Sequence, residues 1–391
     1  MATWPSRPKA YKLKDLLYFQ QNTTFGLTER YLSYLARVTD RCRYNVHFMF
    51  PEVPELRPLE QMGRDGVRLH GLPSGPNTGN LVRLLPMILN VFRQVKPDLI
   101  HFNDPAVAGL LAGRLHRHAA LVITHHTPEL NRRYGLRGKL LDRLAFGGRP
   151  FVIFTSESDR RTGIERDGIR EEDSTVIPYG IDVSSFGKHY DRNGIYKELG
   201  IPPDHRIVGN VARLAAQKGH TYLIEAAKIV LSRHGNVTFV IVGDGALRGK
   251  LNAQTVRAGI AERFVFTGQR SDIPRLLNAF DVFVMPSLFE GLCMAVLEAL
   301  AVALPVVATP VGGIPSSVAE GETGRLVPPR DADALANAIL WMLEHPAEAR
   351  EMGLRGRQLV EANFTMEAML AGTEAVYDRL LSRRENAAEL A

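Results

Sequence analysis

Short apolar runs rich in β-branched and aromatic residues alternate with longer helical patterns along this whole chain, and this alternation constrains the fold more than any other feature. We expect thirteen of these runs to be strands. They lie at residues 15–20, 44–50, 67–70, 98–102, 121–125, 151–155, 175–177, 206–211, 237–242, 264–267, 282–285, 306–308 and 324–327. Because the runs are apolar almost throughout, both faces of each strand should be covered, as in parallel sheets flanked by helices.

The expected strands form two series, separated by segment 182–205, which contains three glycines and the pair Pro202-Pro203. A chain of 391 residues is also about twice the usual length of one domain. The sequence therefore predicts an α/β fold with two facing, doubly wound, Rossmann-like parallel-sheet domains at residues 1–185 and 186–365. We expect the last helix, at 366–391, to pack back on the N-terminal domain.

Composition excludes several other classes of protein. Apolar residues make up 45% and charged residues 23% of the chain, which is typical of a globular protein and not of a disordered or fibrous one. The two cysteines, Cys42 and Cys293, lie too far apart for a metal knuckle or a disulfide framework. The longest apolar stretch, 292–308, is too short and polar to span a bilayer, and no signal peptide is recognisable. We therefore expect a cytoplasmic protein.

The positive charge is concentrated in the first half of the chain. Residues 1–190 contain 27 Lys and Arg against 19 Asp and Glu, whereas residues 191–391 contain 21 against 23. Segment 131–149 is the most basic stretch, and we interpret it as a solvated helical face. The alternative is peripheral contact with an anionic membrane at its inner face, or with an acidic acceptor. We expect no nucleic-acid partner.

The most specific pattern follows the expected strand 282–285 and opens a helix. Gly291 lets the backbone come close to a ligand, and free N–H groups at Leu292 and Cys293 would suit a phosphate. Glu290 and Glu298 are eight residues apart, or roughly 12 Å along a helix, which suits the hydroxyls on either side of a diphosphate. Glu298 lies inside an otherwise apolar run, where a buried carboxylate without a partner is costly. We therefore favour a ligand-binding role for the two glutamates over a structural role in the helix.

Two cations follow the first strand of the second series. Arg213 and Lys218 flank the turn into its helix, where a planar guanidinium and a compact ammonium can neutralise a diphosphate. Basic residues at turns are common, so this pair is a weak signal by itself. In doubly wound sheets ligands bind at the carboxyl ends of strands, and the two glutamates also follow a strand. We therefore interpret all four residues as one site.

Two adjacent histidines end the strand at 121–125. Histidine can hold a sugar hydroxyl or a developing charge, although a single one is more often structural. Because side chains alternate along a strand, only one of the pair should face a ligand, and we choose His126. His101, Asn103 and Asp104, at the end of the preceding strand, are weaker candidates on the acceptor side.

Glycines after other strands are weaker signals. Gly26 would allow a phosphate to approach the loop after the first strand. The Gly243-Asp244-Gly245 turn lacks the third glycine of a dinucleotide fingerprint, since Arg248 occupies that position, so we interpret it as a strand-to-helix turn. Zinc-ligand spacing, a nucleophile elbow and a Walker loop are all missing from the sequence. We expect neither a metal nor a cofactor.

These motifs resemble those of the retaining, two-domain glycosyltransferases of family four, which have the GT-B fold. The similarity covers nearly the whole chain and is strongest from residue 207 to 334. It rests on the two glutamates and on the segments 176–182, 266–268, 308–315 and 324–327. The resemblance implies that the N-terminal domain binds the acceptor and that the C-terminal domain binds a nucleotide sugar.

The resemblance also implies individual roles on the donor side. Arg213 and Lys218 would bind the donor diphosphate, Glu290 would contact the transferred sugar, and Glu298 would hold the nucleotide ribose. Gly268 would lie near the pocket for the base.

On the other domain, His126 would lie near the donor sugar. The implied reaction is metal-independent transfer of a hexosyl unit, with retained configuration, from a nucleotide diphosphate sugar to an acceptor hydroxyl. UDP-sugars are favoured from the family, and the acceptor is open between a saccharide, a lipid-linked molecule and a small molecule. Two alternatives remain, namely a sugar-nucleotide epimerase and a nucleotide-sugar-binding protein without turnover.

Overall fold

A computed structural model describes residues 13–23, 27–73, 81–104, 107–126, 150–187 and 190–389. Within these ranges each of the expected strands has a counterpart, and all pairings between named strands are parallel. The prediction of two parallel α/β sheets is confirmed.

The chain divides into two compact units. Unit 1 comprises residues 1–155, 159–177 and 370–391, and unit 2 comprises residues 156–158 and 178–369. The boundaries expected from the sequence were 185/186 and 365/366. The residues after 177 belong to unit 2 because they bond to the end of that unit: the Ile181 N–H donates to the Phe364 carbonyl at 2.8 Å, and the Gly180 N–H lies 3.1 Å from Met369 Sδ.

Unit 1 is built on a sheet whose seven strands, in the described residues, have the order β3-β2-β1-β4-β5-β6-β7. The strands are β1 (Lys14–Gln20), β2 (Tyr44–Glu52), β3 (Arg68–Pro73), β4 (Leu99–Asn103), β5 (Ala120–His125), β6 (Phe151–Phe154) and β7 (Ser174–Val176). The helices described are α1 (Leu27–Val38), η1 (Pro54–Asp65), α2 (Leu81–Val95), α3 (Val107–Leu115), α5 (Glu157–Asp167), η3 (Glu171–Asp173) and α14 (Met366–Glu389). The strand order reverses between β1 and β4, which places the expected ligand crevice at their carboxyl ends.

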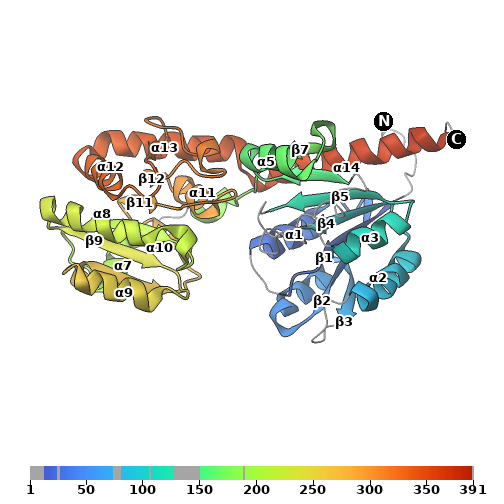
Figure 1. Ribbon diagram of the computed structural model, residues 1–391, viewed down its shortest axis with the longest axis horizontal. Coiled ribbons are helices and arrows are strands. Elements are labelled where there is room, and N and C mark those ends of the chain that lie inside the picture. The colour runs from blue at the N-terminus through green and yellow to red at the C-terminus, as the bar shows by residue number, and fades with distance from the viewer. Residues whose placement is uncertain are drawn as a thin grey trace, which may run out of the picture. The chain divides into compact units, whose positions relative to one another are not determined.

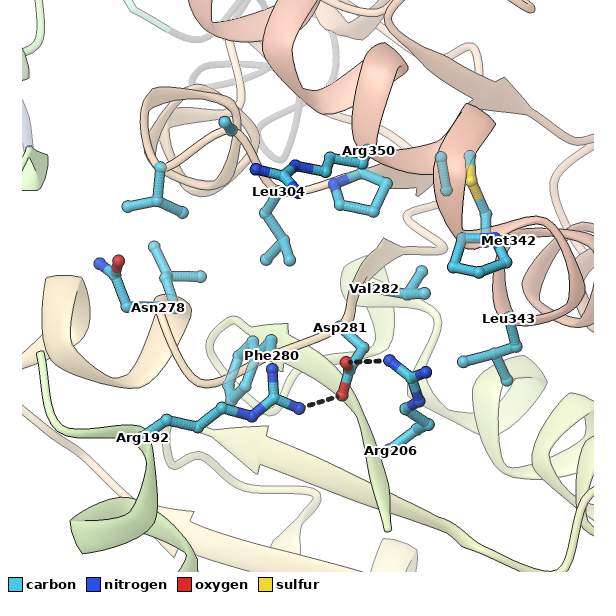
Figure 2. Close-up of a pocket in the computed structure, with 16 residues that line it drawn as sticks. Arg192, Arg206, Asn278, Phe280, Asp281, Val282, Leu304, Met342, Leu343 and Arg350 are labelled. Carbon is cyan, nitrogen blue, oxygen red and sulfur yellow. Dashed lines mark hydrogen bonds and ion pairs between the residues drawn. The ribbon is translucent and has the colours of Figure 1, made fainter. Parts of the chain in front are cut away.

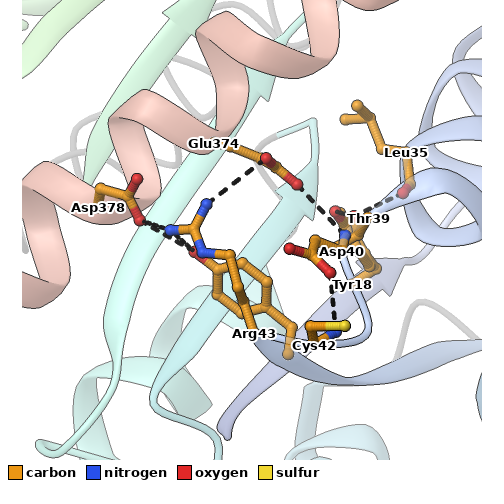
Figure 3. Close-up of polar contacts among 9 residues, drawn as sticks. Tyr18, Leu35, Thr39, Asp40, Cys42, Arg43, Glu374 and Asp378 are labelled. Carbon is orange, nitrogen blue, oxygen red and sulfur yellow. Dashed lines mark hydrogen bonds and ion pairs between the residues drawn. The ribbon is translucent and has the colours of Figure 1, made fainter. Parts of the chain in front are cut away.

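The last helix, α14, is joined to the rest of unit 1 from residue 370 onward by charged and aromatic side chains. Figure 3 shows Glu374 and Asp378 reaching from this helix to Arg43, which forms an ion pair with each. The N–H of Asp40 also donates to the Glu374 carboxylate at 3.4 Å. Tyr377, on the same helix, is completely buried. This stretch of α14 is therefore part of the core of unit 1.

Unit 2 contains a sheet with the order β10-β9-β8-β11-β12-β13. Its strands β9, β11 and β12 are labelled in Figure 1. The strands are β8 (Arg206–Val211), β9 (Val237–Val242), β10 (Phe264–Gly268), β11 (Val282–Met285), β12 (Val306–Ala308) and β13 (Gly324–Leu326). The helices described are α6 (Val183–Phe186), α7 (Arg192–Leu199), η4 (Ala216–Lys218), α8 (His220–Arg233), α9 (Arg248–Arg257), η5 (Ala261–Arg263), α10 (Ile273–Leu277), α11 (Met294–Ala301), η6 (Ile314–Ser316), α12 (Ala332–Glu344) and α13 (Pro346–Asn363). The order of this sheet reverses between β8 and β11, where a ligand is expected.

One face of this sheet is covered by α8 and α12. Ala227 and Val230 of α8 and Ile339 of α12 share a buried cluster with Phe239 and Ile241 of β9. All six residues of β9 are buried, which explains why its sequence is a continuous apolar run with one threonine. The packing anchors the strands rigidly beneath the loops at their carboxyl ends. In the described part of the chain, no helix has both the length and the hydropathy needed to cross a membrane.

Candidate functional site

Lys218 and Glu290 lie side by side at the switch point of the unit 2 sheet. The Lys218 ammonium donates to both carboxylate oxygens of Glu290, at 2.6 and 2.9 Å. The side chains are 17% and 6% exposed, so the pair is shielded from water on most sides. The Ser287 hydroxyl donates to the same carboxylate at 2.5 Å. Residues from the β8 and β11 loops, 72 positions apart in the chain, therefore form one polar cluster.

Hydrogen bonds to backbone carbonyls, one of them from the side-chain amide of Gln217, hold these two loops together. The N–H of Leu288 donates to the Gln217 carbonyl at 2.7 Å, and the Gln217 amide donates to the Phe289 carbonyl at 2.9 Å. Gly219 has φ +68°, and a Cβ there would lie 1.9 Å from the carbonyl oxygen of Pro286. Only glycine allows this approach, and it places Lys218 at the start of α8.

A third loop, after β12, closes against the β11 loop. The Thr309 hydroxyl donates to the Ser287 carbonyl at 2.6 Å, and the Gly313 N–H donates to the Gly291 carbonyl at 2.9 Å. A Cβ at Gly312, where φ is +57°, would lie 1.8 Å from the Glu290 carbonyl. The segment 308–315, which carries part of the family resemblance, is therefore the support of the Glu290 loop.

The loop after β9 supports the Lys218 loop from the other side, a contact that the sequence analysis did not predict. The N–H of Leu214 donates to the Asp244 carbonyl at 2.9 Å. A Cβ at Gly243 would lie 2.1 Å from the Ala212 carbonyl, and one at Gly245 would lie 2.5 Å from the Leu214 carbonyl. The two glycines do form the expected strand-to-helix turn, and their spacing reflects this close contact.

Arg213 differs from Lys218 in its surroundings. It is exposed, and its guanidinium makes no hydrogen bond or ion pair with the residues that the structure describes. It lies on the same loop as Lys218, and its guanidinium carries planar hydrogen-bond donors.

The start of α11 presents backbone donors. The N–H groups of Leu292 and Cys293 have no acceptor among the described residues, as the sequence predicts. Burial raises the pKa of the Cys293 thiol to about 12, so the thiol is expected to be protonated at neutral pH. Glu298 lies on α11 and is half-buried, between fully buried neighbours.

Gly268 ends β10 with φ +75°, and its carbonyl accepts from the Gly243 N–H at 2.9 Å. It thereby joins β10 to the turn that supports the Lys218 loop. Gly26 and the basic segment 131–149 lie outside the described residues.

In unit 1, His126 follows β5 and is buried. Its Nε2 lies 2.6 Å from Asn103 Oδ1, and its backbone N–H donates to the Asp104 carboxylate at 3.1 Å. Burial is the main reason why the pKa of the His126 imidazole lies well below 6.5, and it is also the main reason why the pKa of the Asp104 carboxyl is raised to about 7. Asp104 has φ +64°, a backbone conformation that few residues other than glycine adopt. The contacts around it must therefore hold it in this conformation. Asn103 and Asp104, weak candidates in the sequence, thus contact the stronger one.

Acid should destabilise the fold through its buried histidines. Burial lowers the pKa of His101 to about 3 and the pKa values of His125 and His220 to about 4, against 6.5 in the unfolded chain. The unfolded chain then binds more protons below pH 6.5, so stability falls as the pH drops from 6.5 towards 4, by up to about 1.4 kcal/mol per pH unit for each histidine.

Urea-denaturation midpoints across this pH range measure the effect. His220→Gln should flatten the slope, because it removes one titrating imidazole, while its amide nitrogen can keep the hydrogen bond that Nε2 makes with Asn210 at 3.0 Å. Equal slopes in the wild type and His220→Gln would contradict the explanation.

A cavity of about 420 Å³ lies at the opposite edge of the unit 2 sheet (Figure 2). Asp281 in this cavity accepts from Arg192 and Arg206, at 2.7 and 3.0 Å, as Figure 2 shows. The cavity lies where β8, β11 and β12 begin, so it is separate from the polar cluster around Lys218 and Glu290.

Comparisons with known proteins agree with this architecture. Residues 28–185 match the family described as Glycosyltransferase Family 4, and residues 191–359 match Glycosyl transferases group 1. The lipopolysaccharide core biosynthesis mannosyltransferase LpsB of Rhizobium meliloti is 30% identical over 59% of this chain and 72% of its own length. The chain is a family 4 glycosyltransferase. The expectation of an enzyme of this family is confirmed, and the names of the relatives favour a transferase over an epimerase.

Two further similarities concern this glycosyltransferase. A UDP-Gal:alpha-D-GlcNAc-diphosphoundecaprenol alpha-1,3-galactosyltransferase of Escherichia coli is 29% identical over 73% of this chain and 77% of its own length. The crystal structure of Anabaena HepE in complex with UDP superposes with a TM-score of 0.82, at 24% identity, over 94% of this chain and all of HepE. The glycosyltransferase therefore has the GT-B fold.

Proposed function

We propose that this glycosyltransferase moves a hexosyl unit from a nucleotide diphosphate sugar to an acceptor hydroxyl, with retained configuration and without a metal. The observation that carries the proposal is the cluster at the unit 2 switch point, where Lys218 and Glu290 pair and Arg213 is exposed on the same loop. A diphosphate there would meet two cations and the N–H groups of Leu292 and Cys293. A carboxylate would remain for the sugar hydroxyls.

The proposed step breaks the bond between the anomeric carbon and the leaving phosphate oxygen. Positive charge then develops on the sugar ring and negative charge on the diphosphate, which the preorganised donors stabilise. The acceptor oxygen forms the new bond on the same face, and its proton passes to the departing phosphate oxygen. Glu290, held by Lys218 and Ser287, orients the sugar and does not become covalently attached.

We propose UDP as the nucleotide and a free or lipid-linked saccharide as the acceptor. Support for UDP comes from HepE, which was solved with UDP-glucose, and from the UDP-Gal enzyme of Escherichia coli. Support for the acceptor comes from the lipopolysaccharide and diphosphoundecaprenol names of the relatives. Calorimetry with a panel of nucleotides and nucleotide sugars, followed by transfer assays with the tightest binder, tests the proposal. Failure of every nucleotide diphosphate to bind would overturn it.

Replacing Arg213 with alanine should weaken UDP binding about tenfold or more, because one charge-assisted hydrogen-bond donor to the diphosphate is lost. The dissociation constant from calorimetry measures this loss, which should be smaller for uridine than for UDP. Arg233→Ala, which removes another exposed arginine at the end of α8, is the matched control and should bind UDP normally. Equal affinities in both variants would remove Arg213 from the diphosphate site.

A further inference from the structure

A chain of buried hydrogen bonds runs from the first turn of α1 to His126. The Gln20 amide donates to the Glu29 carboxylate at 2.8 Å, and the Asn103 amide donates to Gln20 Oε1. Asn103 Oδ1 lies 2.6 Å from His126 Nε2. Each of the four side chains belongs to a buried residue, and they come from β1, α1, β4 and the end of β5.

This chain of hydrogen bonds has a direction, which Glu29 sets. A carboxylate can only accept, and here it also accepts from the hydroxyl of Thr28 at 2.8 Å and the amide of Asn22 at 3.4 Å. Gln20 must therefore turn its amide nitrogen towards Glu29 and its oxygen towards Asn103. Asn103 must in turn face His126 with its oxygen, so the proton of the neutral imidazole lies on Nε2.

We propose that Glu29 is a positioning residue that holds His126 in the Nε2–H form through Gln20 and Asn103, so that Nδ1 is the accepting nitrogen. The role of His126 near the donor sugar, which the family resemblance implies, is the one part of the inference that rests on the proposed function. A histidine held in this way can accept a hydrogen bond at Nδ1 and cannot act there as an acid. Two amides, which do not titrate near neutral pH, transmit the orientation without moving a proton.

A neighbouring network shows that the orientation of His126 is not a general property of this sheet. The Thr39 hydroxyl donates to the Leu35 carbonyl at 2.6 Å and so accepts from Tyr18. Tyr18 accepts from Tyr377, whose oxygen therefore accepts from His101 Nδ1 at 2.5 Å. His101 is thus the Nδ1–H form, opposite to His126, and provides an internal reference.

NMR of the imidazole nitrogens in the full chain tests the proposal, because the two neutral forms have different nitrogen shifts and ring-proton couplings. His126→Gln and His101→Gln assign the signals. Wild-type His126 should be the Nε2–H form alone. Glu29→Met and Gln20→Met interrupt the chain at different points, and both should give a mixture of forms at His126 and no change at His101. Glu29→Gln keeps an accepting oxygen and should restore the single form.

Glu367→Met is the matched control, since Glu367 also lies in the first turn of a helix but is exposed. Its spectrum should match that of the wild type. A mixture of forms in wild-type His126, or a single Nε2–H form retained in both Glu29→Met and Gln20→Met, would overturn the proposal.

The kinetic readout separates this inference from the proposed function. In Glu29→Met we expect kcat to fall about tenfold with little change in KM for the donor. A loss of this size is expected when one hydrogen bond in the transition state is misplaced. If the nitrogen shifts change as expected while His126→Gln transfers sugar at the wild-type rate, the positioning by Glu29 stands and the assigned role of His126 fails. If the shifts do not change, the positioning by Glu29 fails whatever the rates are.

Discussion

Replacing Lys218 with alanine is expected to lower kcat/KM for transfer by roughly a thousandfold. Removing a single preorganised donor to developing negative charge costs about a hundredfold to a thousandfold. Here the loss also removes the ion-pair partner of the Glu290 carboxylate, which keeps the hydrogen bond from Ser287. Glu290 is only 6% exposed, so its charge would face the donor diphosphate without the ammonium that now lies 2.6 Å away. Both effects oppose the charge of the leaving group. Steady-state transfer assays and calorimetry with UDP measure the two losses separately.

Two variants test the explanation for Lys218. Lys218→Arg keeps the charge and should recover part of the activity, because a guanidinium also pairs with a carboxylate but is larger and planar where the ammonium is compact. Lys228→Ala removes an exposed lysine on α8 and should behave as the wild type. Near-normal turnover in Lys218→Ala, with the fold intact by circular dichroism, would remove the residue from the reaction.

Replacing Gly219 with alanine is expected to lower kcat about a hundredfold and to reduce the melting temperature by several degrees. The new Cβ would meet the Pro286 carbonyl at 1.9 Å, and the left-handed backbone at φ +68° adds about 1 kcal/mol of strain. Relief of the clash must separate the β8 and β11 loops and thus move Lys218 from Glu290. Displacements of about 1 Å at a reacting centre can cost a hundredfold in rate.

Gly259→Ala separates strain from collision. Gly259 has a similar φ of +71°, but nothing lies within 4 Å of a Cβ there. This variant should lose about 1 kcal/mol of stability and keep its activity. If both glycine variants lose activity equally, or neither does, the contact with Pro286 is not what places the two loops together.

The strands were predictable because most of them are short apolar runs, and β9, with its six buried residues, is the plainest example. Arg213, Lys218 and Glu290 were identifiable because charged residues directly after such strands gather at one edge of a parallel sheet. Gly243 and Gly245 could not be interpreted in the same way. Each lies against a backbone carbonyl of another loop, Gly243 against that of Ala212 and Gly245 against that of Leu214, which leaves no room for a Cβ.

The same limit applies to unit 1. His126 was selected from the alternation of side chains, but Glu29 carried no visible signal, since an acid in the first turn of a helix is ordinary. Its place in the chain to Gln20 and Asn103 depends on β1 and β4 lying next to each other. No local pattern records this pairing.

The sequence alone determined that this chain has two parallel α/β sheets and that charged residues follow some of their strands, because burial and strand periodicity are local properties of the residues. Only the tertiary structure decided that Lys218 pairs with Glu290 and that Glu29 is linked to His126. Such pairings depend on strand order and on backbone approaches of a few ångströms between loops distant in the chain. The free energy of these contacts exists only once the sheet has assembled.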